Sequence, residues 1–245
     1  IAISTFSYAQ TGHYYPADRY SNSLISDLCQ DKYGNIWIAT DYGLNKFDGY
    51  QFTSYLHDDT DSTPICSNAV VELLCDSKGR LWVGTNRGLD LYNDDLNAFI
   101  HYKFPADVRP RISDVVELSD GRILFCTAGY GTFVIGEDNV LKTTEEFSAD
   151  ANDKFFSYAY VDSKNRFWKG AYNNSLLMKA DGKFHSFVST VGSPVGIVER
   201  ADEILIVCLH GIMSYKNGKM QESDIDMSVL KSTDALLSVA KMDSN

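Results

Sequence analysis

Short runs of alternating apolar and polar residues, separated by turns rich in glycine, aspartate and asparagine, extend along most of the chain. In the first such stretch the expected strands are residues 25–30, 35–40, 44–47 and 51–55. Alternation with a period of two, together with many β-branched and aromatic residues, favours strands. The turns between them carry residues that accept positive φ or bond their own backbone. No helical periodicity of useful length interrupts the pattern, which predicts an all-β protein.

The strand pattern repeats along the chain. The residue that opens the second strand of each repeat is Ile36, Leu81, Ile123, Phe167 and Ile204 in turn. The steps between these residues are 45, 42, 44 and 37 residues. Such periods are typical of propeller blades or helical repeats, and the strand-forming composition excludes the helical class. The sequence therefore predicts a β-propeller of four-stranded blades, with about five and a half blades in residues 10–245.

Each well-preserved repeat carries an Asp-x-x-Gly turn followed by a tryptophan in the second strand. The repeated residues are Asp31, Gly34, Trp37, Asp76, Gly79, Trp82, Asp162 and Trp168, with Asn165 in place of the third glycine. We expect the aspartate to bond the turn backbone and the glycine to accept positive φ. The tryptophans are expected to fill the wedge between neighbouring blades. Leu124 and Leu205 replace them in the third and fifth repeats.

Residues 31–52 and 76–92 resemble the two-component regulator propeller repeat. The first segment reads DKYGNIWIATDYGLNKFDGYQF and the second DSKGRLWVGTNRGLDLY. The resemblance covers most of residues 14–245, is strong in the first two repeats and is weak in the third and fifth. It implies the periplasmic sensor region of a hybrid two-component system of gut Bacteroidetes such as Bacteroides. In that family two seven-bladed propellers precede a small β-sandwich, a membrane helix and a histidine kinase.

The resemblance also implies the function and the partners. The usual task of such regions is to detect an oligosaccharide and to switch on glycan-utilisation genes. A homodimer is implied through the parent protein, and membrane contact only through a downstream helix. Residues 14–22 look like the lead-in strand that closes the family's ring.

A complete seven-bladed propeller would need more residues than this sequence has. Seven blades of about 42 residues need roughly 290 residues, and the chain has 245, with a sixth repeat opening at residues 243–245. We therefore expect a fragment of a longer sensor. Residues 1–9 are predicted to be a signal-peptide remnant, because a short apolar stretch ends at the small residues Ser7 and Ala9. The alternative is a short buried strand. Export to the periplasm, with the parent anchored in the inner membrane, is expected.

Composition and motifs exclude several functions. The 33 acidic and 22 basic residues give a net charge of −11, which argues against nucleic-acid binding. No hydrolase elbow, phosphate loop or metal-ligand spacing of histidines occurs, so we predict no catalytic residues, no metal and no cofactor. The five cysteines cannot all pair. We expect buried free thiols, in strands at Cys29, Cys75, Cys126 and Cys208 and in a loop at Cys66.

The candidate binding residues lie at the corner between the second and third strands of each repeat. This corner should share a face with the long connections between blades, at residues 57–68, 105–113, 145–154 and 190–195. Binding residues are frequent on loops held by a rigid scaffold. The corner residues, which differ between repeats, are Tyr42, Arg87, Tyr130, Tyr172, Asn173 and His210. Aromatic rings can stack on sugars, and arginine or amide groups can bind hydroxyls. The alternative is that these are ordinary exposed turn residues.

Three functions stay open at this point: a ligand-sensing propeller, a secreted propeller enzyme acting on glycans, and a scaffold that binds only protein. A glycan-cleaving enzyme would need two facing carboxylates. Many aspartates of this chain are already explained by turns.

Overall fold

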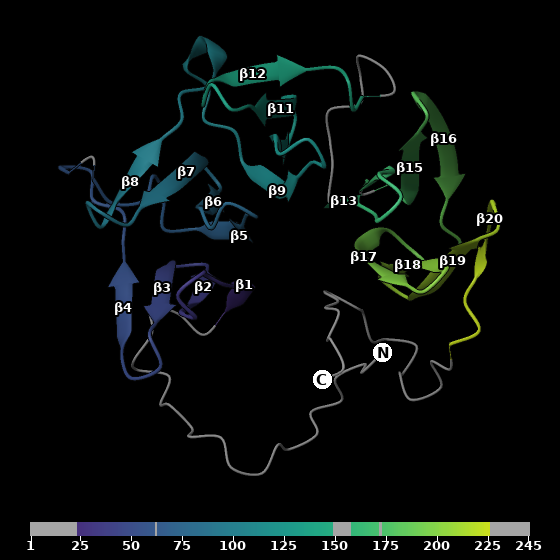
Figure 1. The fold of residues 1–245 in the computed structure, drawn as a ribbon, viewed down its shortest axis with the longest axis horizontal. Helices are drawn as coiled ribbons and strands as arrows, with labels where there is room; N and C mark the ends of the chain where they lie inside the picture. The colour runs from purple at the N-terminus through teal and green to yellow at the C-terminus, as the bar shows by residue number, and fades with distance from the viewer. Residues whose placement is uncertain (1–23, 62, 149–157, 172, 226–245) are drawn as a thin grey trace. The chain divides into compact units, whose positions relative to one another are not determined.

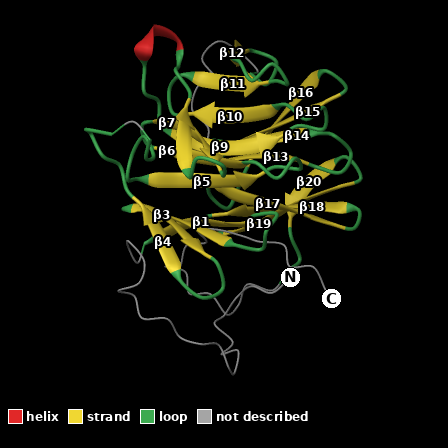
Figure 2. Ribbon diagram, turned by 60° about the vertical axis from the view of Figure 1, so that its left-hand side comes forward, coloured by secondary structure: helices red, strands yellow, loops and turns green. Residues whose placement is uncertain are grey.

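The computed structural model describes residues 24–61, 63–148, 158–171 and 173–225. In these residues twenty strands form five four-stranded antiparallel sheets (Figure 1). The only helix among them is the short 3-10 turn Pro105–Asp107, drawn in red in Figure 2. The all-β prediction and the four-stranded repeat are confirmed. The expected leader (residues 1–9), lead-in strand (14–22) and sixth repeat (243–245) lie outside the described residues.

The described residues between 24 and 148 form one compact unit with three sheets. The first sheet consists of β1 (Ile25–Gln30), β2 (Ile36–Thr40), β3 (Gly43–Phe47) and β4 (Phe52–Tyr55). The second consists of β5 (Val70–Cys75), β6 (Leu81–Thr85), β7 (Gly88–Asn93) and β8 (Ala98–His101). The third consists of β9 (Ile112–Glu117), β10 (Ile123–Thr127), β11 (Gly131–Ile135) and β12 (Leu141–Thr144).

The described residues between 158 and 225 belong to a second compact unit with two sheets. One consists of β13 (Tyr158–Val161), β14 (Phe167–Gly170), β15 (Ser175–Ala180) and β16 (Lys183–Val188). The other consists of β17 (Pro194–Arg200), β18 (Glu203–Cys208), β19 (Gly211–Lys216) and β20 (Lys219–Glu222). In all five sheets the strands follow chain order, so each sequence repeat folds as one propeller blade.

Neighbouring sheets of a unit pack through their first strands. Strand β5 lies beside both β1 and β9, and β17 lies beside β13. The amide of Leu73 on β5 donates a hydrogen bond of 2.8 Å to the carboxylate of Asp27 on β1. The first strands of adjacent blades are therefore linked directly.

A bulge shapes the first strand in four of the five described sheets. One residue has no partner on the second strand, at Ser26, Val71, Ser113 and Val195. In the first unit the residue after each bulge is acidic, and we call Asp27, Glu72 and Asp114 the acidic row. Burial raises the pKa of Glu72, and the charges of the other two carboxylates raise it further. Burial also raises the pKa of Asp27.

The three tryptophans are completely buried, as the repeat pattern predicts. Trp37 of the first sheet packs in one cluster with Leu73 and Leu81 of the second. The ring of Tyr92, on the outer part of the second sheet, meets Trp37 edge-on at 4.8 Å between centroids. The prediction that the ring fills the space between blades is confirmed for Trp37.

The aspartate of the turn bonds the tryptophan of the second strand as well as the turn backbone in the first, second and fourth sheets. Asp76 accepts hydrogen bonds from the amides of Lys78 and Arg80, at 3.0 and 2.8 Å, as expected for the turn. It also accepts a bond of 2.9 Å from the indole N–H of Trp82. The matching indole bonds measure 2.9 Å in the first sheet and 2.8 Å in the fourth. The repeated aspartate and tryptophan are thus one hydrogen-bonded unit.

The third sheet lacks both members of this pair. Leu118 stands at the aspartate position and Leu124 at the tryptophan position, and both side chains are buried. A buried indole N–H without an acceptor, or a buried carboxylate without donors, costs free energy. The joint replacement by two leucines avoids both costs.

Candidate functional site

A threonine at the end of the second strand holds each corner of the first unit. Thr85 Oγ1 donates to the carbonyl of Gly88 at 3.0 Å and accepts the amide of Arg87 at 3.1 Å. Thr40 and Thr127 bond the corresponding glycine carbonyls at 2.8 and 2.7 Å. The same threonine-to-glycine hydrogen bond therefore closes the corner in all three sheets of the first unit, although the corner of the third sheet is one residue longer. Sequence reasoning missed this threonine.

The corners share a face with the connections between blades, as predicted. The corner amide of Asn86 donates to the carbonyl of Ala69 in the connection before β5, at 3.0 Å. Ala128 bonds Arg111 in the same way at 3.0 Å. Corner and connection are thus joined by backbone hydrogen bonds, which makes this face a rigid platform.

The predicted corner residues are exposed. Tyr42 and Tyr130 expose 52% and 51% of their surface, and Arg87, Asn173 and His210 are also exposed. Tyr172 lies outside the described residues. Of the five described candidates, only Arg87 lines a cleft that lies over the second sheet. Asn173 and His210 belong to the second unit. The expected gathering of all corner residues into one site therefore stays a prediction.

The cleft has a volume of about 670 Å³ and lies over the second sheet. Its walls come from the connections on either side of that sheet, from the Arg87 corner, and from strands β7 and β8. The lining residues are His57, Asp58, Asp59, Thr60, Asp61, Cys66, Arg87, Gly88, Leu89, Asp90, His101, Tyr102, Lys103, Phe104, Asp107, Val108 and Arg109.

The cleft offers both signs of charge to a ligand. Exposed cationic groups come from Arg87, Lys103 and Arg109. Carboxylates come mainly from residues 58–61, where the hydroxyl and amide of Thr60 donate to Asp58 at 2.7 and 2.8 Å. These bonds lower the pKa of Asp58, which therefore stays ionised. Such a lining can donate to and accept from a ligand rich in hydroxyl groups.

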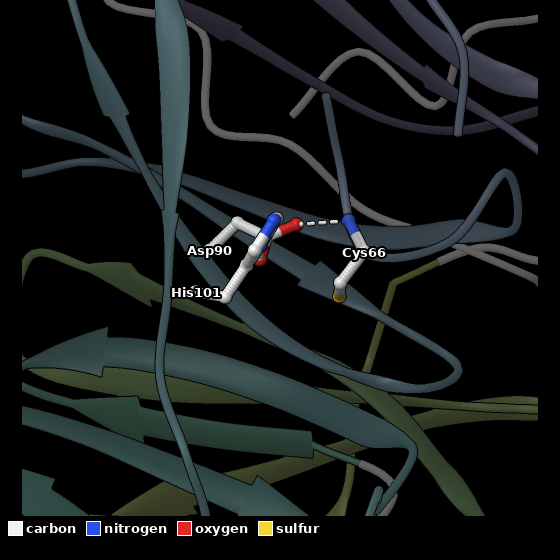
Figure 3. A group of neighbouring side chains, drawn as sticks. All are labelled: Cys66, Asp90 and His101. Atoms are coloured by element: carbon white, nitrogen blue, oxygen red, sulfur yellow. Dashed lines mark hydrogen bonds and ion pairs between the residues drawn. The ribbon is translucent and has the colours of Figure 1, made fainter. Parts of the chain in front are cut away.

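Cys66, Asp90 and His101 all line the cleft and lie next to one another (Figure 3), and we call these three residues the floor of the cleft. The Asp90 carboxylate has no exposed surface. One of its oxygens accepts the amide of Cys66 at 2.8 Å, and the other lies 2.6 Å from Nδ1 of His101. Sγ of Cys66 lies 3.1 Å from the hydroxyl of Thr85. The floor is therefore tied to the threonine that holds the Arg87 corner.

The aspartate on the floor is unusual among the blades. The register places Asn45, Phe133, Leu177 and Met213 at its position in the other four described sheets. Three of these are apolar. Among the described sheets, a carboxylate at this position occurs only in the second blade.

Cys66, Asp90 and His101 could also act as metal ligands. One donor atom from each lies within 4.8 Å of the others, and thiolate, carboxylate and imidazole suit a cation such as zinc. Burial, with the charge of Asp90, raises the pKa of the Cys66 thiol, so a metal would have to displace a firmly held proton. Sequence reasoning missed this group because its members come from segments 24 and 11 residues apart, with no local motif.

Comparison with known proteins matches two segments of the chain to a family. Residues 19–42 and 64–87 match the family described as two component regulator propeller. A stretch of 50 residues is 48% identical to histidine kinase P4 of Formosa agariphila, covering 20% of this chain and 4% of the kinase.

Solved structures share the fold. The extracellular domain assigned to a hybrid two-component system of B. thetaiotaomicron is 19% identical, with a TM-score of 0.56, over 91% of this chain and 38% of that one. Virginiamycin B lyase from Staphylococcus aureus is 20% identical, with a TM-score of 0.64, over 82% of this chain and 70% of the lyase. The chain thus spans well under half the length of the kinase and of the extracellular domain.

No helix among the described residues has the length and apolar content needed to cross a bilayer. The described sheets, their repeated turns and the matched segments agree with one another. Two segments of the chain match the two-component regulator propeller family, and the described sheets fold as blades of a β-propeller.

Proposed function

We propose that this chain is the ligand-sensing propeller of a hybrid two-component protein, located in the periplasm, and that it detects an oligosaccharide. The matched repeats and the likeness to an extracellular domain of such a system support the class and the location. The parent would be a dimeric histidine kinase anchored in the inner membrane. Its output would be the control of glycan-utilisation genes.

The cleft over the second blade is the observation that carries the proposal. It combines the Arg87 guanidinium with the carboxylates of residues 58–61 on a face held by backbone hydrogen bonds. The connection after the second sheet has Ala106 and Asp107 at φ values of 57° and 52°, and Asp107 lines the cleft. Non-glycine residues in this left-handed region are strained, and such strain is frequent at binding sites.

Signalling in this proposal is a shift between populations. The ligand must bind one arrangement of the exported region more tightly than another, and the kinase responds to that difference. The propeller contributes the affinity, and the parts of the parent that follow it contribute the switch.

Calorimetry of the whole exported region against a panel of oligosaccharides tests the proposal. We expect binding without turnover, and Arg87→Ala should weaken it about tenfold, which corresponds to roughly 1.4 kcal/mol. Tyr42→Ala is the matched variant, because it changes the same corner position in a blade outside the cleft. Loss of affinity in Arg87→Ala alone would favour the cleft. Loss in both variants would favour the wider set of corners.

Other outcomes would favour the other functions. Turnover of a glycan would identify an enzyme, and the shared fold of virginiamycin B lyase gives a reason to assay the products of each incubation. Association with protein partners, with no oligosaccharide bound, would identify a scaffold. Unchanged affinity in both variants would remove the cleft and the corners from consideration.

A further inference from the structure

Two cysteines of neighbouring blades meet in the first unit. Cys29 lies on β1 and Cys75 on β5, and their sulfur atoms are 2.7 Å apart. This separation is shorter than the ordinary contact between two non-bonded sulfur atoms, and longer than a disulfide bond of about 2.04 Å. All five cysteines are free thiols in the structure, as predicted, but only Cys126 and Cys208 are fully buried, and Cys29, Cys66 and Cys75 are half-buried.

The packing of the first strands explains the meeting. Asp27 and Leu73 are joined by a hydrogen bond, and they are 46 residues apart. Cys29 and Cys75 are also 46 residues apart. Cys29 follows Asp27 by two residues, and Cys75 follows Leu73 by two. The alignment of the two strands that joins Asp27 to Leu73 therefore also brings the two thiols together. The backbone alignment, and not a chance rotamer, places the sulfur atoms next to each other.

We propose that Cys29 and Cys75 form a disulfide that joins the first and second blades. Both side chains are half-buried, and both pack against the cluster around Trp37. The bond would close a loop around the first Asp–Trp turn and the whole first connection between blades. It would therefore fix the spacing of the first strands next to the acidic row.

Oxidation of the pair needs a disulfide oxidant, for which glutathione disulfide serves. The hydrogen bond from Cys29 lowers the pKa of Cys75, so Cys75 loses its proton first and attacks the oxidant as a thiolate. One glutathione thiolate leaves, and a mixed disulfide forms on Cys75. Cys29 then loses its proton and attacks the Cys75 sulfur, and the second glutathione leaves. Two electrons and two protons pass from the protein to two glutathione thiols.

The remaining cysteines are placed as single thiols. Cys126 and Cys208 are fully buried, and Cys66 lies on the floor of the cleft. The hydroxyl of Ser189 lies 3.2 Å from Cys208, and that of Thr85 lies 3.1 Å from Cys66. The structure thus separates one pair from three single thiols, which accounts for the odd count.

Differential thiol labelling of the full protein tests the bond. The protein is equilibrated in a glutathione redox buffer, and free thiols are blocked with N-ethylmaleimide under denaturing conditions. The remaining sulfurs are reduced, labelled with iodoacetamide and read by peptide mass spectrometry. We expect the iodoacetamide label at Cys29 and Cys75, and the maleimide label at Cys66, Cys126 and Cys208. Unreduced digests should contain one peptide pair joined through Cys29 and Cys75.

Two variants sharpen the result. In Cys29→Ser the unreduced digest should contain Cys75 as a free thiol or as its mixed disulfide with glutathione, and no joined peptide pair, whereas Cys66→Ser should leave the pair unchanged. Maleimide on both Cys29 and Cys75 in an excess of oxidised glutathione would overturn the proposal. So would a peptide that joins either residue to a different cysteine. The labelling pattern of the wild-type protein shows whether the disulfide forms, even where a variant does not fold.

Discussion

The hydrogen bond between Asp76 and Trp82 allows a quantitative test of how a blade is stabilised. We consider Asp76→Leu, Trp82→Leu and the double variant, which recreates in the second blade the pair that the third blade carries. Asp76→Leu leaves the indole N–H of Trp82 buried without its acceptor, and this costs about 1–3 kcal/mol. The two turn amides lose bonds worth about 1 kcal/mol each. Because the new leucine buries apolar surface, we expect a net loss of about 3 kcal/mol.

The double variant should lose less than the two single variants together. Trp82→Leu removes packing from a fully buried ring, and it leaves the Asp76 carboxylate without one donor. When both residues are leucine, neither a buried donor nor a buried carboxylate is left unpaired. We therefore expect the sum of the single losses to exceed the double loss by about 1–2 kcal/mol.

Denaturant unfolding followed by far-ultraviolet circular dichroism measures the cycle, because this signal does not depend on the tryptophan itself. Asp120→Ala in the third blade is the control. The Asp120 side chain is 51% exposed and pairs with Arg122 at 2.7 Å, so its loss should cost less than about 1 kcal/mol. Single losses that add to the double loss within about 0.5 kcal/mol would refute the reasoning.

Three further predictions follow from the buried groups. Trp82→Ala should cost about 3–5 kcal/mol in the free energy of unfolding, and an unchanged melting temperature would contradict the blade-core role. The raised pKa of Glu72 means that the folded state holds its proton more tightly than the unfolded state. Stability is therefore greatest below the unfolded pKa of about 4.3 and falls as pH rises from there towards the raised value. The melting temperature should therefore decrease as the pH rises from about 4.3. Glu72→Gln should flatten this slope, and an equal slope in both proteins would count against the acidic row. Reduction of the proposed disulfide should remove about 4 kcal/mol, the chain-entropy value for its loop, whereas a reductant should not change the melting temperature of Cys29→Ser.

The strands and turns of each blade follow from local sequence. Alternation, turn residues and a constant period predicted the strands of the first sheet to within one residue, from Ile25–Gln30 to Phe52–Tyr55. The same local logic predicted positive φ at Gly34, Gly79 and Asn165. These features depend on residues close together in the chain, and for that reason the sequence alone was enough.

The tertiary structure decided which distant residues meet. The group of Cys66, Asp90 and His101 depends on three segments that converge on one cleft. Among the described corner residues, only Arg87 lines that cleft. The pairing of Cys29 with Cys75 depends on the offset between neighbouring first strands. The repeated sequence specifies the strands and turns of each blade. Contacts between blades depend on how the blades pack, which no local sequence pattern encodes.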